Sequence, residues 1–115
     1  MTKKPLHQIA QGDVLWTLVS DLPIEKHPNG KLRPAPVEGG RYIFARGEAT
    51  GHHHSSVAEG CTLNLDEGGM MFLTVDQLTE VTHQEHGTVV LEPGVYRVDQ
   101  QQEVDVWGDW RPVVD

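Results

Sequence analysis

The chain has 115 residues, a formal net charge of −8, a mean hydropathy of −0.41 and a single cysteine. This length suits one hydrophobic core, so we expect a single domain over residues 1–115. No apolar run approaches the roughly 18 residues of a membrane-spanning helix, and one cysteine excludes an internal disulfide framework. The first residues lack the apolar segment of a signal peptide, so we expect a cytoplasmic protein with no membrane partner.

The charge is unevenly distributed along the chain. Residues 1–46 hold seven Lys and Arg against four acids, whereas residues 47–115 hold two against thirteen. The acidic part would repel phosphates, so we expect no nucleic-acid partner. The basic part either binds an anion locally or complements the acidic part within the fold.

Short β-prone runs separated by Gly, Pro, Asn and Asp follow one another, and no stretch of a dozen residues has helical periodicity. The pattern predicts an all-β fold, either a small barrel or a sandwich. The strongest local prediction is a hairpin over 88–98, because Glu92-Pro93-Gly94 suits a type II turn. The predicted strands are Val14–Val19, Arg41–Arg46, Ala49–Val57, Cys61–Leu65, Met70–Val75, Leu78–Val81, Thr88–Leu91, Val95–Val98 and Glu103–Trp107.

The segment Asp21–Gly40 interrupts this pattern, because its four prolines and three glycines leave little from which to build a strand. Loops of this length in a compact domain are usually lids, binding loops or mobile segments. Its basic residues Lys26, Lys31 and Arg33 either meet an anionic ligand or are simply solvated at the surface.

Five of the seven histidines lie in two short bursts. Neutral imidazole is the commonest protein metal ligand, so such bursts are candidate metal sites. In the first burst His52 and His54 are two residues apart, which places both rings on one face of a strand. His53 points to the other face and is left out of the predicted site.

In the second burst His83 and His86 are three residues apart. A turn would bring them together, and Gly87 directly after them favours a turn. Zn, Fe, Ni, Cu and Mn all accept imidazole ligands, and the sequence does not choose among them. We therefore predict one site for a divalent transition metal, with ligands from both bursts: His52, His54, His83 and His86.

Two carboxylates accompany the histidines. Glu85 lies inside the second burst, and Glu48 shares a strand face with His52 and His54 if that strand begins early. Either carboxylate could be a further ligand, transfer protons or orient an imidazole. Two alternatives need no metal: an exposed polar strand end with a turn, or a histidine site that binds an anion or senses pH. The single Cys61 is expected to be a buried small residue and not a ligand.

The first histidine burst also resembles a family motif. Four residues separate Gly47 from the burst, and four more separate the burst from Glu59. The His-x-His and Glu spacing is similar to the first motif of the cupins, double-stranded β-helix proteins that often carry a metal, although the glycine spacings differ. The resemblance implies His52, His54 and Glu59 as ligands, which makes Glu59 a rival to the second burst.

The second cupin motif is matched only in part. Gly87, five further residues and Pro93 fit it, whereas Tyr96 or Arg97 stands where its last metal-binding histidine falls. The resemblance thus implies a fold and three ligands, and a fourth ligand would have to come from the second burst.

These features favour a small metal-binding β domain with a binding or structural role, assembled as a homo-oligomer. Trp107 and Trp110 fit this hypothesis because tryptophans often anchor interfaces, and they fit equally well as a cover over one end of a barrel. The alternative is a cupin-like metalloenzyme acting on an unidentified small molecule, in which the metal polarises a substrate oxygen or activates water.

Overall fold

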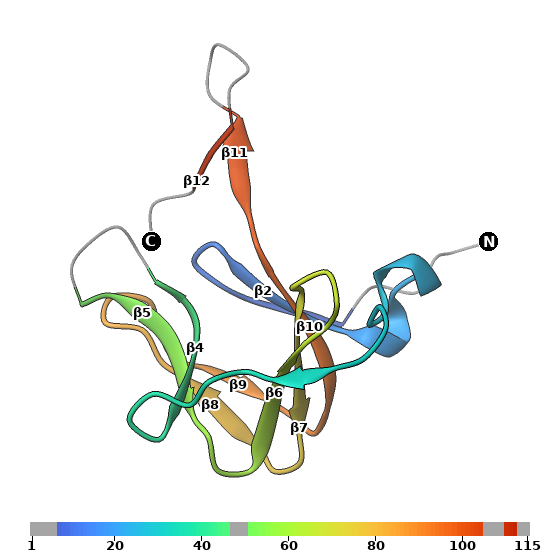
Figure 1. Ribbon diagram of the computed structural model, residues 1–115. Helices are drawn as coiled ribbons and strands as arrows, with labels where there is room; N and C mark the ends of the chain where they lie inside the picture. The colour runs from blue at the N-terminus through green and yellow to red at the C-terminus, as the bar shows by residue number, and fades with distance from the viewer. Residues whose placement is uncertain (1–6, 47–50, 105–109, 113–115) are drawn as a thin grey trace.

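The computed structural model describes residues 7–46, 51–104 and 110–112, with side chains up to residue 101. These residues form antiparallel strands and two short 3₁₀ turns, so the predicted all-β class is confirmed (Figure 1). None of them forms a helix long and apolar enough to span a membrane. The elements are β1 (Gln8–Gln11), β2 (Val14–Leu18), η1 (Val19–Asp21), η2 (Ile24–Lys26), β3 (Arg33–Pro34), β4 (Arg41–Arg46), β5 (His53–Val57), β6 (Cys61–Leu65), β7 (Met71–Val75), β8 (Thr79–Val81), β9 (Val89–Leu91), β10 (Gly94–Gln100), β11 (Gln102–Val104) and β12 (Trp110–Pro112).

Six strands form one antiparallel sheet in the order β1-β2-β10-β7-β6-β3. The long strand β10 holds the sheet together, since Val98 pairs with Trp16 of β2 on one side and with Met71 of β7 on the other. β4 with β5, β8 with β9, and β11 with β12 form three separate two-stranded ladders. One isolated bridge, between Ser55 and Thr82, connects β5 to the chain just after β8.

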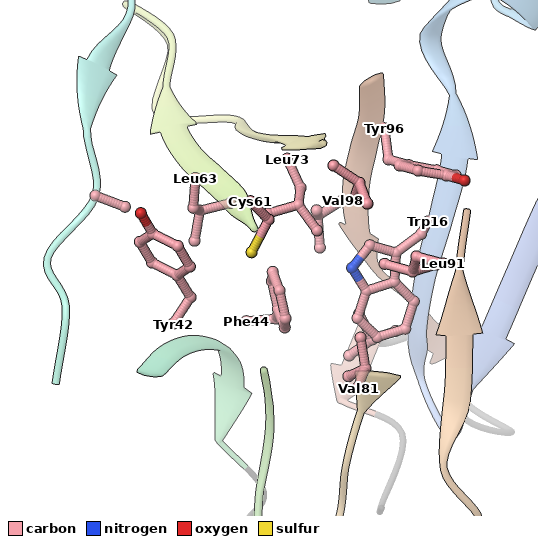
Figure 2. Packing of buried hydrophobic residues seen from close by; sticks show 13 residues of the cluster. Trp16, Tyr42, Phe44, Cys61, Leu63, Leu73, Val81, Leu91, Tyr96 and Val98 are labelled. Atoms are coloured by element: carbon pink, nitrogen blue, oxygen red, sulfur yellow. The ribbon is translucent and has the colours of Figure 1, made fainter. Parts of the chain in front are cut away.

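The hydrophobic core receives side chains from the large sheet and from the β4–β5 and β8–β9 ladders. Figure 2 shows Trp16 of β2, Phe44 of β4 and Leu91 of β9 pointing toward one another. Trp16 is fully buried, and its ring meets Phe44 edge-on with centroids 5.3 Å apart. Edge-on contact is a favoured aromatic geometry, so this pair fixes β4 against the sheet. Cys61 lies in the same core, as expected, and burial raises the pKa of its thiol.

The hairpin predicted over 88–98 is wrong. β9 pairs with β8, whereas β10 pairs with β2 and β7. Gly94 has a φ of +153°, far from the value of about +80° that a type II turn requires. Glu92–Gly94 instead carries the chain from one ladder to another, and Leu91 and Tyr96 on either side of it are both buried in the core. β9 and β10 therefore bury Leu91 and Tyr96 by pairing with different strands and not with each other.

Other differences concern polar and terminal strands. The sequence pattern did not predict β1, β3 or β12, which are polar, very short or proline-containing. The strand predicted over Ala49–Val57 begins at His53, and residues 47–50 lie outside the described part of the chain. The strand predicted over Glu103–Trp107 lies partly outside it as well.

The proline-rich segment over residues 21–40 lies along the edge of the large sheet at β6, where β3 pairs with Leu65 and Asn64. The Asp66 carboxylate fastens it there by accepting hydrogen bonds from the backbone N–H groups of Asn29 and Met70. Arg97 donates from its guanidinium to the Lys26 carbonyl at 3.1 Å. These contacts hold the segment on β6 and on the β10 strand.

Candidate functional site

The two histidine bursts are cross-strand neighbours. The N–H of Ser55 donates to the Thr82 carbonyl at 3.1 Å, and the N–H of Thr82 donates back to the Ser55 carbonyl at 2.8 Å. In an antiparallel pair the residue before one partner faces the residue after the other, so this bridge sets His54 opposite His83. Their ring centroids are 4.4 Å apart. A separation of 29 residues in sequence thus becomes direct contact.

The same register continues outward from the bridge. The His53 N–H donates to the Gln84 side-chain oxygen at 2.7 Å, and His52 Nδ1 lies 3.7 Å from Glu85 Oε1. Each residue of the first burst therefore faces its counterpart in the second.

A tight turn over residues 83–87 brings the fourth histidine into the cluster. His83 Nδ1 accepts hydrogen bonds from the backbone N–H groups of Glu85 at 3.0 Å and His86 at 3.2 Å. A ring nitrogen that accepts carries no proton, so neutral His83 holds its proton on Nε2. The His86 ring lies 4.7 Å from that of His83 and 6.0 Å from that of His54. Two imidazoles on one tetrahedral ion have centroids about 5 Å apart, so a modest shift of the His86 ring would let it share an ion with His54. The His83 ring has no free lone pair for an ion, because its Nδ1 accepts these hydrogen bonds.

A two-residue hairpin loop, Gly12-Asp13, brings a carboxylate to the cluster from β1 and β2. Gly12 has a φ of +56°, which fits the first central position of a type II′ turn. A Cβ at Gly12 would lie only 2.6 Å from His86 Nε2. Glycine is therefore needed here both for the turn and for the close approach of His86.

Asp13 and His54 form the most buried part of the site. Their side chains are 3% and 1% exposed, and His54 Nε2 lies 3.3 Å from Asp13 Oδ1. The other carboxylate oxygen, Oδ2, accepts a hydrogen bond from Gln100 Nε2 at 2.7 Å. A buried carboxylate is costly unless a positive partner compensates its charge. Oδ1 has no hydrogen-bond partner within the described residues, and the His54 nitrogen faces it.

Gln11 sets the orientation of the His54 ring. Its Nε2 donates to the carbonyls of Val81 at 3.0 Å and Gly87 at 2.9 Å, which leaves Oε1 as the acceptor for His54 Nδ1 at 2.8 Å. His54 Nδ1 must therefore carry a proton. In the neutral ring the lone pair on Nε2 then faces a carboxylate oxygen, so a proton or a cation is required between them.

The separation between the two atoms fits a metal ion. Two ligands bound at about 2.0–2.1 Å to one tetrahedral ion lie about 3.3–3.4 Å apart. A charge-assisted N–H···O bond is shorter, at about 2.7–2.9 Å. His54 would also have the usual support of a metal ligand, because its other ring nitrogen donates to the Gln11 oxygen.

A third ligand is close but not in place. His86 Nε2 is buried and has no hydrogen-bond partner among the described residues. Within that part of the chain, no three His, Cys, Asp or Glu side chains already converge as a complete metal site. The arrangement thus has two fixed donor atoms, and His86, whose Nε2 is unpartnered among the described residues, is the candidate for a third through a change of its ring position.

The remaining predicted residues lie in different places. Glu85 is 59% exposed at the rim of the cluster beside His52. Glu59 is exposed beyond the end of β5 and lines a separate hollow with Arg41 and Leu78. Glu48 lies outside the described residues, and so do the side chains of Trp107 and Trp110.

Sequence reasoning missed the two residues that orient the site, Gln11 and Asp13. Nothing in their spacing connects them to histidines more than forty residues away. The available signal was Gly12-Asp13, because Gly at the first position of a two-residue loop predicts a hairpin. It would have placed a carboxylate at a hairpin tip, without showing what that tip contacts.

A family model described as "Domain of unknown function (DUF8820)" matches residues 10–101. The chain belongs to this family. The matched range of the DUF8820 domain includes every residue of the site, from Gln11 and Asp13 to the second histidine burst. No curated protein and no solved structure matches the chain.

Proposed function

We propose that this domain binds one divalent transition metal ion, with His54 Nε2 and Asp13 Oδ1 as its fixed ligands and His86 as the third. The observation that carries the proposal is the 3.3 Å separation of two buried donor atoms. Around it, Gln11 fixes the lone pair of His54 toward the carboxylate. The predicted four-histidine site thereby becomes a mixed site, in which a carboxylate joins the imidazoles.

The role that this site supports best is structural. Its three ligands come from the β1–β2 hairpin tip, from β5 and from the turn after β8, so a bound ion would join three segments. Such an ion would offset the buried charge of Asp13 and stabilise the fold as a ligand that binds only the native state.

A metalloenzyme is the second candidate, and the donor set favours it. Two histidines and one carboxylate with open positions are the ligands of many non-haem iron enzymes. The cupin resemblance also stays a prediction in that direction. Burial argues for the structural role instead, because ligands that are 1% and 3% exposed leave a substrate little access.

Cobalt titration tests the proposal. Co²⁺ takes zinc-type ligands and gives a visible absorption band, so the native protein should bind one equivalent. His54→Gln and Asp13→Asn should each weaken binding by about 100-fold or more, since second-layer changes alone cost about 10–100-fold. His53→Gln, in the same strand but outside the ligand set, should stay within about threefold.

Circular dichroism of each variant separates lost binding from lost folding. Folded wild-type protein that binds no Co²⁺ would contradict the proposal and leave a metal-free proton between His54 and Asp13 as the alternative. Unchanged binding by folded Asp13→Asn would contradict the role of the carboxylate.

A further inference from the structure

Exposure decreases in steps from the surface to the proposed ligands. Glu85 is 59% exposed and His52 is 22% exposed, whereas Asp13 and His54 are 3% and 1% exposed. We call His52 and Glu85 the outer pair, and His54 and Asp13 the inner pair. The residues His52 and His54 are two positions apart in the first burst, where His52 faces Glu85, and Asp13 reaches His54 from the tip of the β1–β2 hairpin.

One ring connects the outer pair to the inner pair. The His83 centroid lies 5.7 Å from that of His52 and 4.4 Å from that of His54. A hydrated ion at the surface would thus meet the carboxylate and imidazole of the outer pair first, then pass beside the His83 ring, and then reach the buried ligands.

The outer pair is also suited to hold a cation briefly. His52 Nδ1 and Glu85 Oε1 are 3.7 Å apart, too far for a hydrogen bond, and His52 Nδ1 has no hydrogen-bond partner among the described residues. Both atoms can therefore act as donors to an ion without giving up an existing contact. Because Glu85 is well solvated, an ion bound there keeps several of its waters and is held weakly.

We infer that Glu85 and His52 form an access relay, a transient station through which a divalent metal ion reaches and leaves the inner pair. This inference rests on the proposed function. A relay lowers the barrier between solvent and the buried site and leaves the stability of the final complex unchanged. Loss of the relay should therefore slow binding and release by the same factor.

Stopped-flow mixing with Co²⁺, followed by release to a chelator, measures both rates. Glu85→Gln should slow association and dissociation equally, by about tenfold, which is at the lower limit of local electrostatic effects on encounter rates. The equilibrium Kd should not change. Glu80→Gln is the matched control, because it removes an exposed carboxylate from β8, away from the histidines, and should leave both rates within about twofold.

Three results would overturn the relay. Faster release with weaker Kd in Glu85→Gln would make Glu85 a ligand, and unchanged rates would give it no role. If Glu80→Gln slowed Co²⁺ association and dissociation as much as Glu85→Gln, the effect would come from the net charge of the protein and not from a relay. Wild-type protein that binds no Co²⁺ would instead contradict the proposed metal site itself, so the two failures are distinguishable.

Discussion

At the scale of single residues, the site depends on groups that have no counterpart in a ligand motif. Gln11 is fully used by two backbone carbonyls and by His54, which fixes the position of the His54 proton. The sequence could predict the histidines, because two bursts of one rare residue are visible in any reading. It could not predict Gln11 or Asp13, since their roles arise from a hairpin tip that contacts a distant strand.

Gly12 offers a test at this scale with a matched control elsewhere in the chain. Gly12 and Gly39 have similar φ angles, +56° and +58°, but a Cβ at Gly39 would meet nothing within 4 Å. Alanine at either position should destabilise the protein by about 1–2 kcal/mol, because both would occupy the left-handed region. Only Gly12→Ala should also weaken Co²⁺ binding, by about tenfold or more, since it displaces His86.

Urea unfolding and Co²⁺ titration of the two alanine variants give both quantities. Equal metal affinities in Gly12→Ala and Gly39→Ala would show that the position of His86 is irrelevant to binding.

At the scale of elements, the alternation of apolar and polar residues predicted where the strands lie better than which strands pair. β4 and β6 match their predicted bounds, and β2 and β7 differ from theirs by one residue, because a buried face leaves a two-residue period in the sequence. The predicted 88–98 hairpin failed for a different reason. A turn dipeptide reports local geometry, whereas partner choice depended on where Leu91 and Tyr96 could be buried.

The proline-rich segment over residues 21–40 provides a prediction about pH. Backbone N–H groups of Asn29 and Met70 hydrogen-bond to the Asp66 carboxylate and lower its pKa. Because the folded pKa lies below the unfolded value of about 3.9, this stabilisation is complete at neutral pH. It is lost as the pH falls below about 4 and through the folded pKa.

Urea midpoints at pH 7 and at pH 3 check this dependence. Asp66→Asn should be less stable than wild type at pH 7 and should lose less stability on acidification. Asp76→Asn changes an exposed aspartate that takes no part in these hydrogen bonds, and its urea midpoint should match that of wild type at both pH 7 and pH 3. If the urea midpoints of Asp66→Asn and wild type fell by the same amount between pH 7 and pH 3, Asp66 would not anchor the segment.

At the scale of the whole molecule, the site is the point where separate parts of the fold meet. The β1–β2 hairpin belongs to the six-stranded sheet, whereas β5 and β8 belong to two smaller ladders. Figure 1 shows β5 beside the β8–β9 ladder, which it contacts through β8. Such a meeting point depends on long-range register, which no local pattern encodes. For this reason the sequence indicated an all-β fold and the presence of a site, but not its composition.

Anomalous diffraction from crystals grown with Zn²⁺ tests the central proposal most directly, since it locates the ion itself. We predict one strong peak at the zinc edge, about 2.0–2.2 Å from both His54 Nε2 and Asp13 Oδ1. A His86 ring turned toward that peak would complete the set. A fully loaded crystal with its zinc elsewhere, or with a direct hydrogen bond between Asp13 and His54, would contradict the account.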